Sequence, residues 1–246
     1  MKKLFVVAGA FALVAGTAFA SGGGAHWGYE GHAGPENWGS LSPEYEMCGK
    51  GMNQSPIDLT GMIEAELAPI AIDYKESALD VVNNGHTIKA SYDAGSTITV
   101  NGHTFKLLQV HWHTPSENHI EGKSFPMEAH FVHSDDAGNL AVISVMYEEG
   151  AENAAIAPVW DNMPAMSGNT SKGAAKISAM NMLPESKDYY RFNGSLTTPP
   201  CSEGVLWMVM KAPVTASAAQ IEKFHGTFHH DTNRPVQPVN ARPVLK

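Results

Sequence analysis

The chain has 246 residues, and its 25 acidic residues outnumber its 16 Lys and Arg residues, giving a formal net charge of −9. An acidic surface repels nucleic acids and anionic membranes, so both are excluded as partners. The length and the 43% share of hydrophobic residues are sufficient for one large domain with a sizeable core.

The N-terminal segment has the features of a secretory signal peptide. Lys2 and Lys3 precede an apolar stretch over residues 4–14, and Ala18-Phe19-Ala20 provides an A-x-A cleavage site. A transmembrane anchor is the alternative, which the short apolar core, rich in Ala and Gly, disfavours. We therefore expect a signal peptide at residues 1–20 and a mature domain at residues 21–246, soluble in the periplasm or secreted, with no membrane span.

Short β-branched and apolar runs recur between Asn-Gly and Asp-rich turn signals, which is typical of strands joined by turns. The clearest predicted strands cover residues 78–82, 97–100 and 140–147. Two helices are predicted at residues 151–160 and 216–228, the second with Ser217 as a candidate cap. The sequence thus predicts a single, mainly β (α+β) domain with short peripheral helices.

The two cysteines, Cys48 and Cys201, would meet an oxidising compartment after secretion. One intramolecular disulfide is the natural interpretation. It would close a loop of roughly 150 residues and contribute at most about 5 kcal/mol in the chain-entropy model. Free thiols and an interchain bridge are alternatives that the sequence leaves open.

A His-x-His pattern lies in a predicted strand at residues 109–113. Because side chains alternate between the faces of a strand, Gln109, His111 and His113 share one face, while Val110 and Trp112 lie on the other. Two imidazoles on one strand face can bind a single metal ion. The pattern alone is a weak signal, because histidines also occur without a metal.

A second predicted strand, at residues 128–133, strengthens the metal hypothesis. Alternation places Glu128 and His130 on one face and His133, which we expect to be structural, on the other. Three nitrogen ligands with an open fourth position are typical of catalytic zinc, whereas structural zinc is usually held by four side chains. Gln109 and Glu128 are the candidates to hold the second ring nitrogens of the ligands.

These motifs, taken together, resemble the α-class carbonic anhydrases of the bacterial secreted type. The matching segments span nearly the whole mature chain: HWGY at 26–29, GPENW at 34–38, NQSPID at 53–58, NNGH at 83–86, QVHWH at 109–113, PSE at 115–117, EAHFVH at 128–133, GSLTTPP at 194–200 and NRPVQ at 233–237. Several segments are modest alone, but their order and joint presence are specific.

The resemblance implies a role for each matching residue. His111, His113 and His130 match the zinc ligands, so the expected cofactor is Zn²⁺. Thr197 matches the threonine whose hydroxyl donates to Glu117 and accepts from the nucleophile on zinc. Without the family match, residues 197–200 would be interpreted as a rigid turn.

Further matches place the substrate and the proton path. The apolar pocket for carbon dioxide would comprise Val132, Val142, Leu196, Thr198, Val205 and Trp207. His86 matches the proton shuttle, and Tyr29 and Asn84 match members of the solvent network beside it. Lys89 departs from the family pattern, because many relatives have an uncharged amide there. The cysteines match the internal disulfide of the bacterial family.

The implied activity is reversible hydration of carbon dioxide to bicarbonate by a hydroxide bound to zinc, with ester hydrolysis as a side reaction. The implied fold is a large, twisted, mostly antiparallel central sheet with the zinc at the bottom of a cone-shaped cleft. Inhibition by sulfonamides and anions, and a homodimer, are further expectations. A non-catalytic binding protein on this fold and a periplasmic zinc carrier are the alternatives. The first would lack zinc histidines, and the second would have them in exposed loops.

Overall fold

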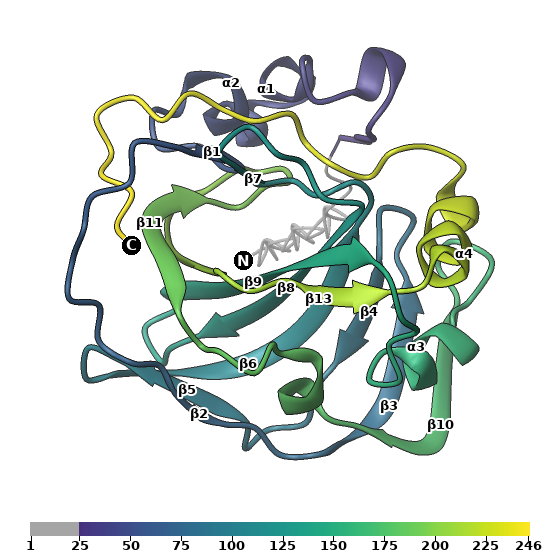
Figure 1. Cartoon of the computed structure of the whole chain (residues 1–246). Coiled ribbons are helices and arrows are strands. Elements are labelled where there is room, and N and C mark those ends of the chain that lie inside the picture. The colour runs from purple at the N-terminus through teal and green to yellow at the C-terminus, as the bar shows by residue number, and fades with distance from the viewer. Residues whose placement is uncertain (1–24) are drawn as a thin grey trace, which may run out of the picture.

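A computed structural model describes residues 25–246, so the signal peptide predicted at residues 1–20 lies outside the described residues. One large sheet dominates the molecule, and short helices lie at its periphery (Figure 1). Its strands are β2 (Ala71–Asp73), β3 (Ser77–Asn83), β4 (Ile88–Ser91), β5 (Thr97–Val100), β6 (His103–His113), β8 (Met127–Ser134), β9 (Leu140–Glu149), β10 (Thr170–Ile177), β11 (Tyr189–Ser195), β12 (Glu203–Met210) and β13 (Val214–Ala216). The mainly β prediction is confirmed.

The main path of the sheet is β10-β3-β4-β6-β8-β9-β12-β11, with β13 beside β9 and β5 joining β2 to β6. All pairs are antiparallel except those of β9 with β12 and β13. A second, small sheet pairs β1 (Asp58–Leu59) with β7 (His119–Ile120) in parallel. The predicted strands at residues 78–82, 97–100 and 140–147 lie within β3, β5 and β9.

The helices are short. They comprise α1 (Trp38–Leu41), α2 (Met47–Lys50), α3 (Ala157–Asp161), α4 (Ala218–Phe228) and the 3₁₀ turns η1 (Gly31–Ala33), η2 (Pro43–Tyr45) and η3 (Ala179–Met182). Ser217 caps α4 as predicted. Its hydroxyl accepts from the Gln220 amide, and the Gln220 side-chain oxygen accepts from the Ser217 amide.

The helix predicted at residues 151–160 is wrong over its first half. Only α3 is helical there, and Pro158 lies in its first turn, where its missing N–H costs nothing. Upstream, the Asn153 carboxamide accepts from the Ala155 amide, and the Asn153 amide donates to Gln220. These contacts hold the segment as a turn, a use of Asn that competes with helix.

A β-bulge in β6 determines which side chains face the site. The pairing of β6 with β8 shifts register between Leu107 and Gln109. Before the shift Phe105 and Leu107 are in the main core, and after it Val110 and Trp112 are. A single extra residue therefore exchanges the two faces of the strand, a known use of bulges near active sites. As a result His111 and His113 face away from the core.

No helix among residues 25–246 is long and apolar enough to cross a membrane.

Cys48 and Cys201 form a disulfide, and both lie in a small cluster with Trp38 and Tyr45. This pairing agrees with the expected intramolecular bridge and fits an extracellular or periplasmic protein.

Candidate metal centre and active site

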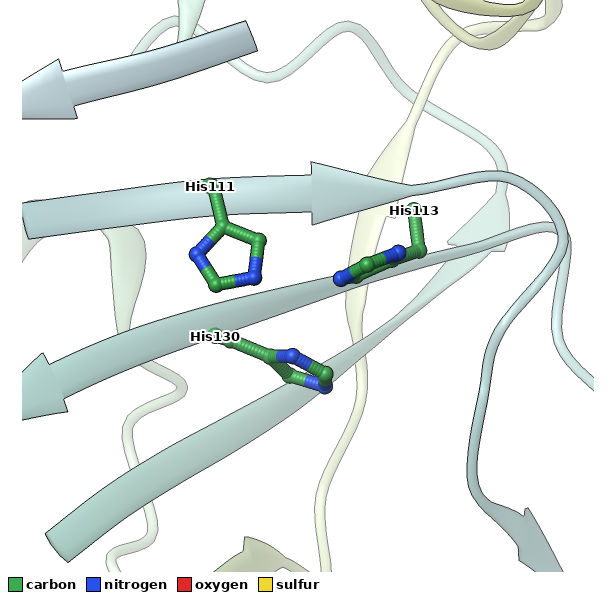
Figure 2. A group of neighbouring side chains, drawn as sticks. All are labelled: His111, His113 and His130. Atoms are coloured by element: carbon green, nitrogen blue, oxygen red, sulfur yellow. The ribbon is translucent and has the colours of Figure 1, made fainter. Parts of the chain in front are cut away.

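Three imidazoles converge at the centre of the sheet, on the face opposite the main core. His111 and His113 extend from β6 toward His130 on the adjacent β8 (Figure 2). His111 and His130 are direct partners in the antiparallel register, which places their side chains on one face. One ligand atom of each ring lies within 4.8 Å of the others, and within residues 25–246 this is the only such group of three His, Cys, Asp or Glu residues.

The second nitrogen of each ring is held by the protein. His111 Nδ1 lies 2.9 Å from Gln109 Oε1, His113 Nδ1 lies 2.5 Å from the Thr232 carbonyl, and His130 Nε2 lies 2.8 Å from Glu128 Oε1. Since each partner is an acceptor, each of these ring nitrogens donates its proton. The nitrogens left to bind a metal are therefore Nε2 of His111, Nε2 of His113 and Nδ1 of His130.

The residues present fit a zinc ion. Buried His113 Nε2 has no hydrogen-bond partner among the described residues, a costly state unless an ion binds it. Burial lowers the pKa of His113, and burial followed by the nearby histidines and Lys89 lowers the pKa of His111 well below its usual value. Neutral rings are the state that binds metal. Three nitrogen ligands are the set of a catalytic zinc site with one open position.

Glu128 is a buried carboxylate with five hydrogen-bond donors. Its Oε2 accepts from the backbone amides of Glu117 (2.7 Å) and Asn118 (2.8 Å). Its Oε1 accepts from the Asn118 carboxamide, the Ser144 hydroxyl and His130. Burial raises the pKa of this carboxyl, but His130 and the other donors outweigh burial and bring the pKa to about 2. Glu128 therefore stays ionised and fixes the ring of His130.

Replacing Glu128 with glutamine is expected to weaken zinc binding about 10- to 100-fold, the usual effect of losing a group that holds a metal ligand. A carboxamide presents one NH₂ to a pocket that contains only donors, so His130 loses its orientation. Competition with a chelator of known affinity measures the change. Exposed Glu149 on β9 supplies the control, and equal affinities for Glu149→Gln and Glu128→Gln would contradict this role.

Glu117 lies between the metal-binding rings and Thr197. Its Oε2 is 3.4 Å from His113 Nε2, and its Oε1 accepts from the Arg234 amide at 2.8 Å. Burial raises the pKa of Glu117 to about 7, although His130, the Arg234 amide and a hydrogen bond from the Thr197 side chain act in the opposite direction. Glu117 Oε2 is buried without a hydrogen-bond partner among the described residues, and Thr197 is buried close enough to influence the pKa of this carboxyl.

An apolar cluster lies beside the imidazoles. Buried Val142, Val205 and Trp207 form its centre, and half-buried Val132 and Leu196 pack against it. The ring centroid of Trp207 is 4.9 Å from that of His130. Five of the six residues predicted for the substrate pocket are therefore in one cluster. The sixth, Thr198, is half-buried beside Thr197. Such a wall suits a small apolar molecule.

The family model for eukaryotic-type carbonic anhydrases matches residues 33–246. The chain belongs to the α-carbonic anhydrase family. It is 48% identical over 238 residues to a carbonic anhydrase of Neisseria gonorrhoeae, covering 95% of this chain and 94% of that protein.

Solved structures extend this family match to the fold. An α-carbonic anhydrase from Thermovibrio ammonificans in complex with the inhibitor sulfanilamide is 52% identical, with a TM-score of 0.89 over 91% of this chain and 100% of that one. A hyperthermostable carbonic anhydrase from a hydrothermal vent chimney is 54% identical, with a TM-score of 0.88 over 89% of this chain and 99% of that one. The enzyme class is therefore that of the carbonic anhydrases, whose family activity is the hydration of carbon dioxide.

His86 lies in the turn between β3 and β4. Its half-buried ring stacks on Trp27 with centroids 3.7 Å apart, and the Tyr29 ring is 6.5 Å away. The Asn84 carboxamide oxygen accepts from the amides of His86 and Thr87. Asn84 therefore shapes the turn that presents His86. Burial, followed by the charges of His26 and His230, lowers the pKa of His86.

Several residues that support the site carry no signal in the sequence. The Thr232 carbonyl and the Arg234 amide act through the backbone, which every residue possesses. Asn118 and Ser144 reach Glu128 from other strands and loops.

His133 was expected to be structural, and it is buried between the Tyr74 hydroxyl and the Ala141 carbonyl. Burial lowers its pKa to about 4.

Proposed function

We propose that this chain hydrates carbon dioxide reversibly to bicarbonate and a proton, with Zn²⁺ bound by His111, His113 and His130. The convergence of three imidazoles, each with one nitrogen free and the other held by an acceptor, carries the proposal. When bound, zinc lowers the pKa of a coordinated water to about 7, the effect for which carbonic anhydrases are the standard example, and so supplies a nucleophile at neutral pH.

The protein orients the reactants. Glu117 accepts a hydrogen bond from the Thr197 hydroxyl. The lone pairs of that hydroxyl are therefore left to accept from the nucleophile and to fix its direction. The apolar cluster around Val142 and Trp207 holds carbon dioxide against the metal site. Gln109 and Glu128 keep the ligand rings oriented while charge changes at the metal.

The test is stopped-flow hydration of carbon dioxide by residues 21–246. We expect fast hydration that is lost on zinc chelation, restored by added zinc and blocked by a sulfonamide, and inhibition by simple anions. Sulfonamide binding is supported by the complex of the Thermovibrio ammonificans relative with sulfanilamide. A folded, zinc-loaded protein without hydration activity would instead support a non-catalytic binding protein.

The proposed proton shuttle is His86. Because its pKa lies below the usual 6.5, the ring is neutral at pH 7 and can accept the proton that the reaction releases. We expect His86→Ala to slow hydration mainly at low buffer concentration, with recovery on addition of imidazole. Equal loss at every buffer concentration would exclude His86 from this role.

We further propose that the mature protein is periplasmic or secreted, with residues 1–20 as its signal peptide. The disulfide between Cys48 and Cys201 supports this location. N-terminal sequencing of the exported protein tests the cleavage site. The homodimer expected from the resemblance is tested by sedimentation of the purified domain.

A further inference from the structure

A second histidine near Tyr29, His230, has no part in the mechanism proposed above. It follows α4, and its half-buried ring has its centroid 6.1 Å from that of Tyr29, while the Tyr29 ring is 6.5 Å from His86. The chain then continues to Thr232, whose carbonyl accepts from His113. His230 is therefore carried by the segment that reaches the metal site.

The hydrogen bond of His230 determines which nitrogen is free. Nδ1 lies 2.8 Å from the backbone carbonyl of Asp231, an acceptor, so the neutral ring carries its proton on Nδ1. Nε2 is then unprotonated and available to accept. The charge of His230 also lowers the pKa of His86, although burial and the charge of His26 have larger effects. Both rings therefore lie near the ring of Tyr29.

A solvent-open cavity of about 490 Å³ adjoins His230 and reaches Tyr29. Glu30, Glu36 and Asp231 line it, and Asp231 Oδ1 lies 3.3 Å from His225 Nε2. These carboxylates offer hydrogen-bond acceptors to solvent beside the ring of His230. A proton on His230 would therefore have acceptors on the side that opens to bulk water.

We propose that His230 is a second proton acceptor of this enzyme, acting in parallel with His86; the inference rests on the proposed function. In a turnover that uses this path instead of His86, a proton released at the metal site passes through solvent to Nε2 of His230. The ring becomes an imidazolium with protons on both nitrogens, and it then loses the Nε2 proton to buffer in the adjoining cavity. Nδ1 keeps its bond to the Asp231 carbonyl throughout, so the ring returns to its starting state.

Hydration measured at low buffer concentration tests the proposal with His86→Ala, His230→Ala and the double variant. We expect His86→Ala to retain a residual rate and the double variant to fall well below it, because a positioned general acid or base typically contributes about 10²- to 10⁴-fold. Added imidazole should return the double variant to the rate of imidazole-supplemented His86→Ala. A double variant equal to His86→Ala would overturn the proposal.

Two controls separate proton transfer from structure. His229→Asn removes the neighbouring, exposed imidazole, and Asn tolerates its left-handed backbone (φ 61°); its buffer dependence should match wild type. Oxygen-isotope exchange between carbon dioxide and bicarbonate at chemical equilibrium does not require proton export, so His230→Ala should leave it unchanged. Reduced exchange in His230→Ala would show that His230 acts by placing Thr232 and His113, which overturns the proposal. Absence of hydration in wild type at every buffer concentration would instead refute the proposed function.

Discussion

Replacing Thr197 with alanine is expected to lower kcat/KM for carbon dioxide by about 10²-fold, the typical cost of losing the orientation of a reacting group. In the proposed mechanism the Thr197 hydroxyl donates to Glu117, and Glu117 is itself fixed by the Arg234 amide at 2.8 Å. Without the hydroxyl, the nucleophile loses the acceptor that aligns it with the substrate. Zinc content should be unchanged, because Thr197 is not a ligand.

Two matched variants at this position make the measurement decisive. Thr197→Val keeps the shape of the side chain but removes the hydroxyl, so it should be as slow as Thr197→Ala. Thr197→Ser keeps the hydroxyl and should retain most of the activity. If serine and valine instead gave equal losses, packing of the side chain rather than its hydrogen bond would explain the effect. Stopped-flow hydration at saturating buffer isolates this step from proton export.

The two strands that carry the metal ligands could be predicted because alternation is a local rule. The pattern at residues 109–113 puts Gln109, His111 and His113 on one face, and the structure brings Gln109 to His111. The bulge near Leu107 could not be predicted in this way. A register shift depends on the pairing of β6 with β8, and its trace in the sequence is the change of phase from Phe105 and Leu107 to Val110 and Trp112.

The contacts that support the site were harder to predict from the sequence, because many of them join segments far apart in the chain. Glu128 could be assigned to His130 because both lie on one strand face, two residues apart. Its other donors come from Glu117, Asn118 and Ser144, whose proximity arises only from the folded sheet. The incorrect helix at residues 151–160 has the same origin. There the long-range contacts of Asn153 with α4 override local helix propensity.

Removing the disulfide is expected to lower the free energy of unfolding by about 2–5 kcal/mol, toward the upper end because the bridge joins residues 153 apart. Cys48→Ala and Cys201→Ala together cause this loss by freeing the unfolded chain. In the folded protein, the Cys48 carbonyl still accepts from Arg234 and the Cys201 carbonyl from Gln54. Denaturant unfolding of oxidised wild type and the double variant measures the difference.

These hydrogen bonds also decide what the disulfide does for catalysis. Gln54 Oε1 accepts from the buried Arg234 guanidinium, so both cysteine segments are attached to one network that is independent of the bridge. We therefore expect the folded double variant to keep a kcat close to wild type, despite Cys201 lying four residues after Thr197. Wild type treated with dithiothreitol should behave like the variant, which should itself be insensitive to the reagent. A large loss of kcat with unchanged stability would show instead that the bridge serves to position Thr197.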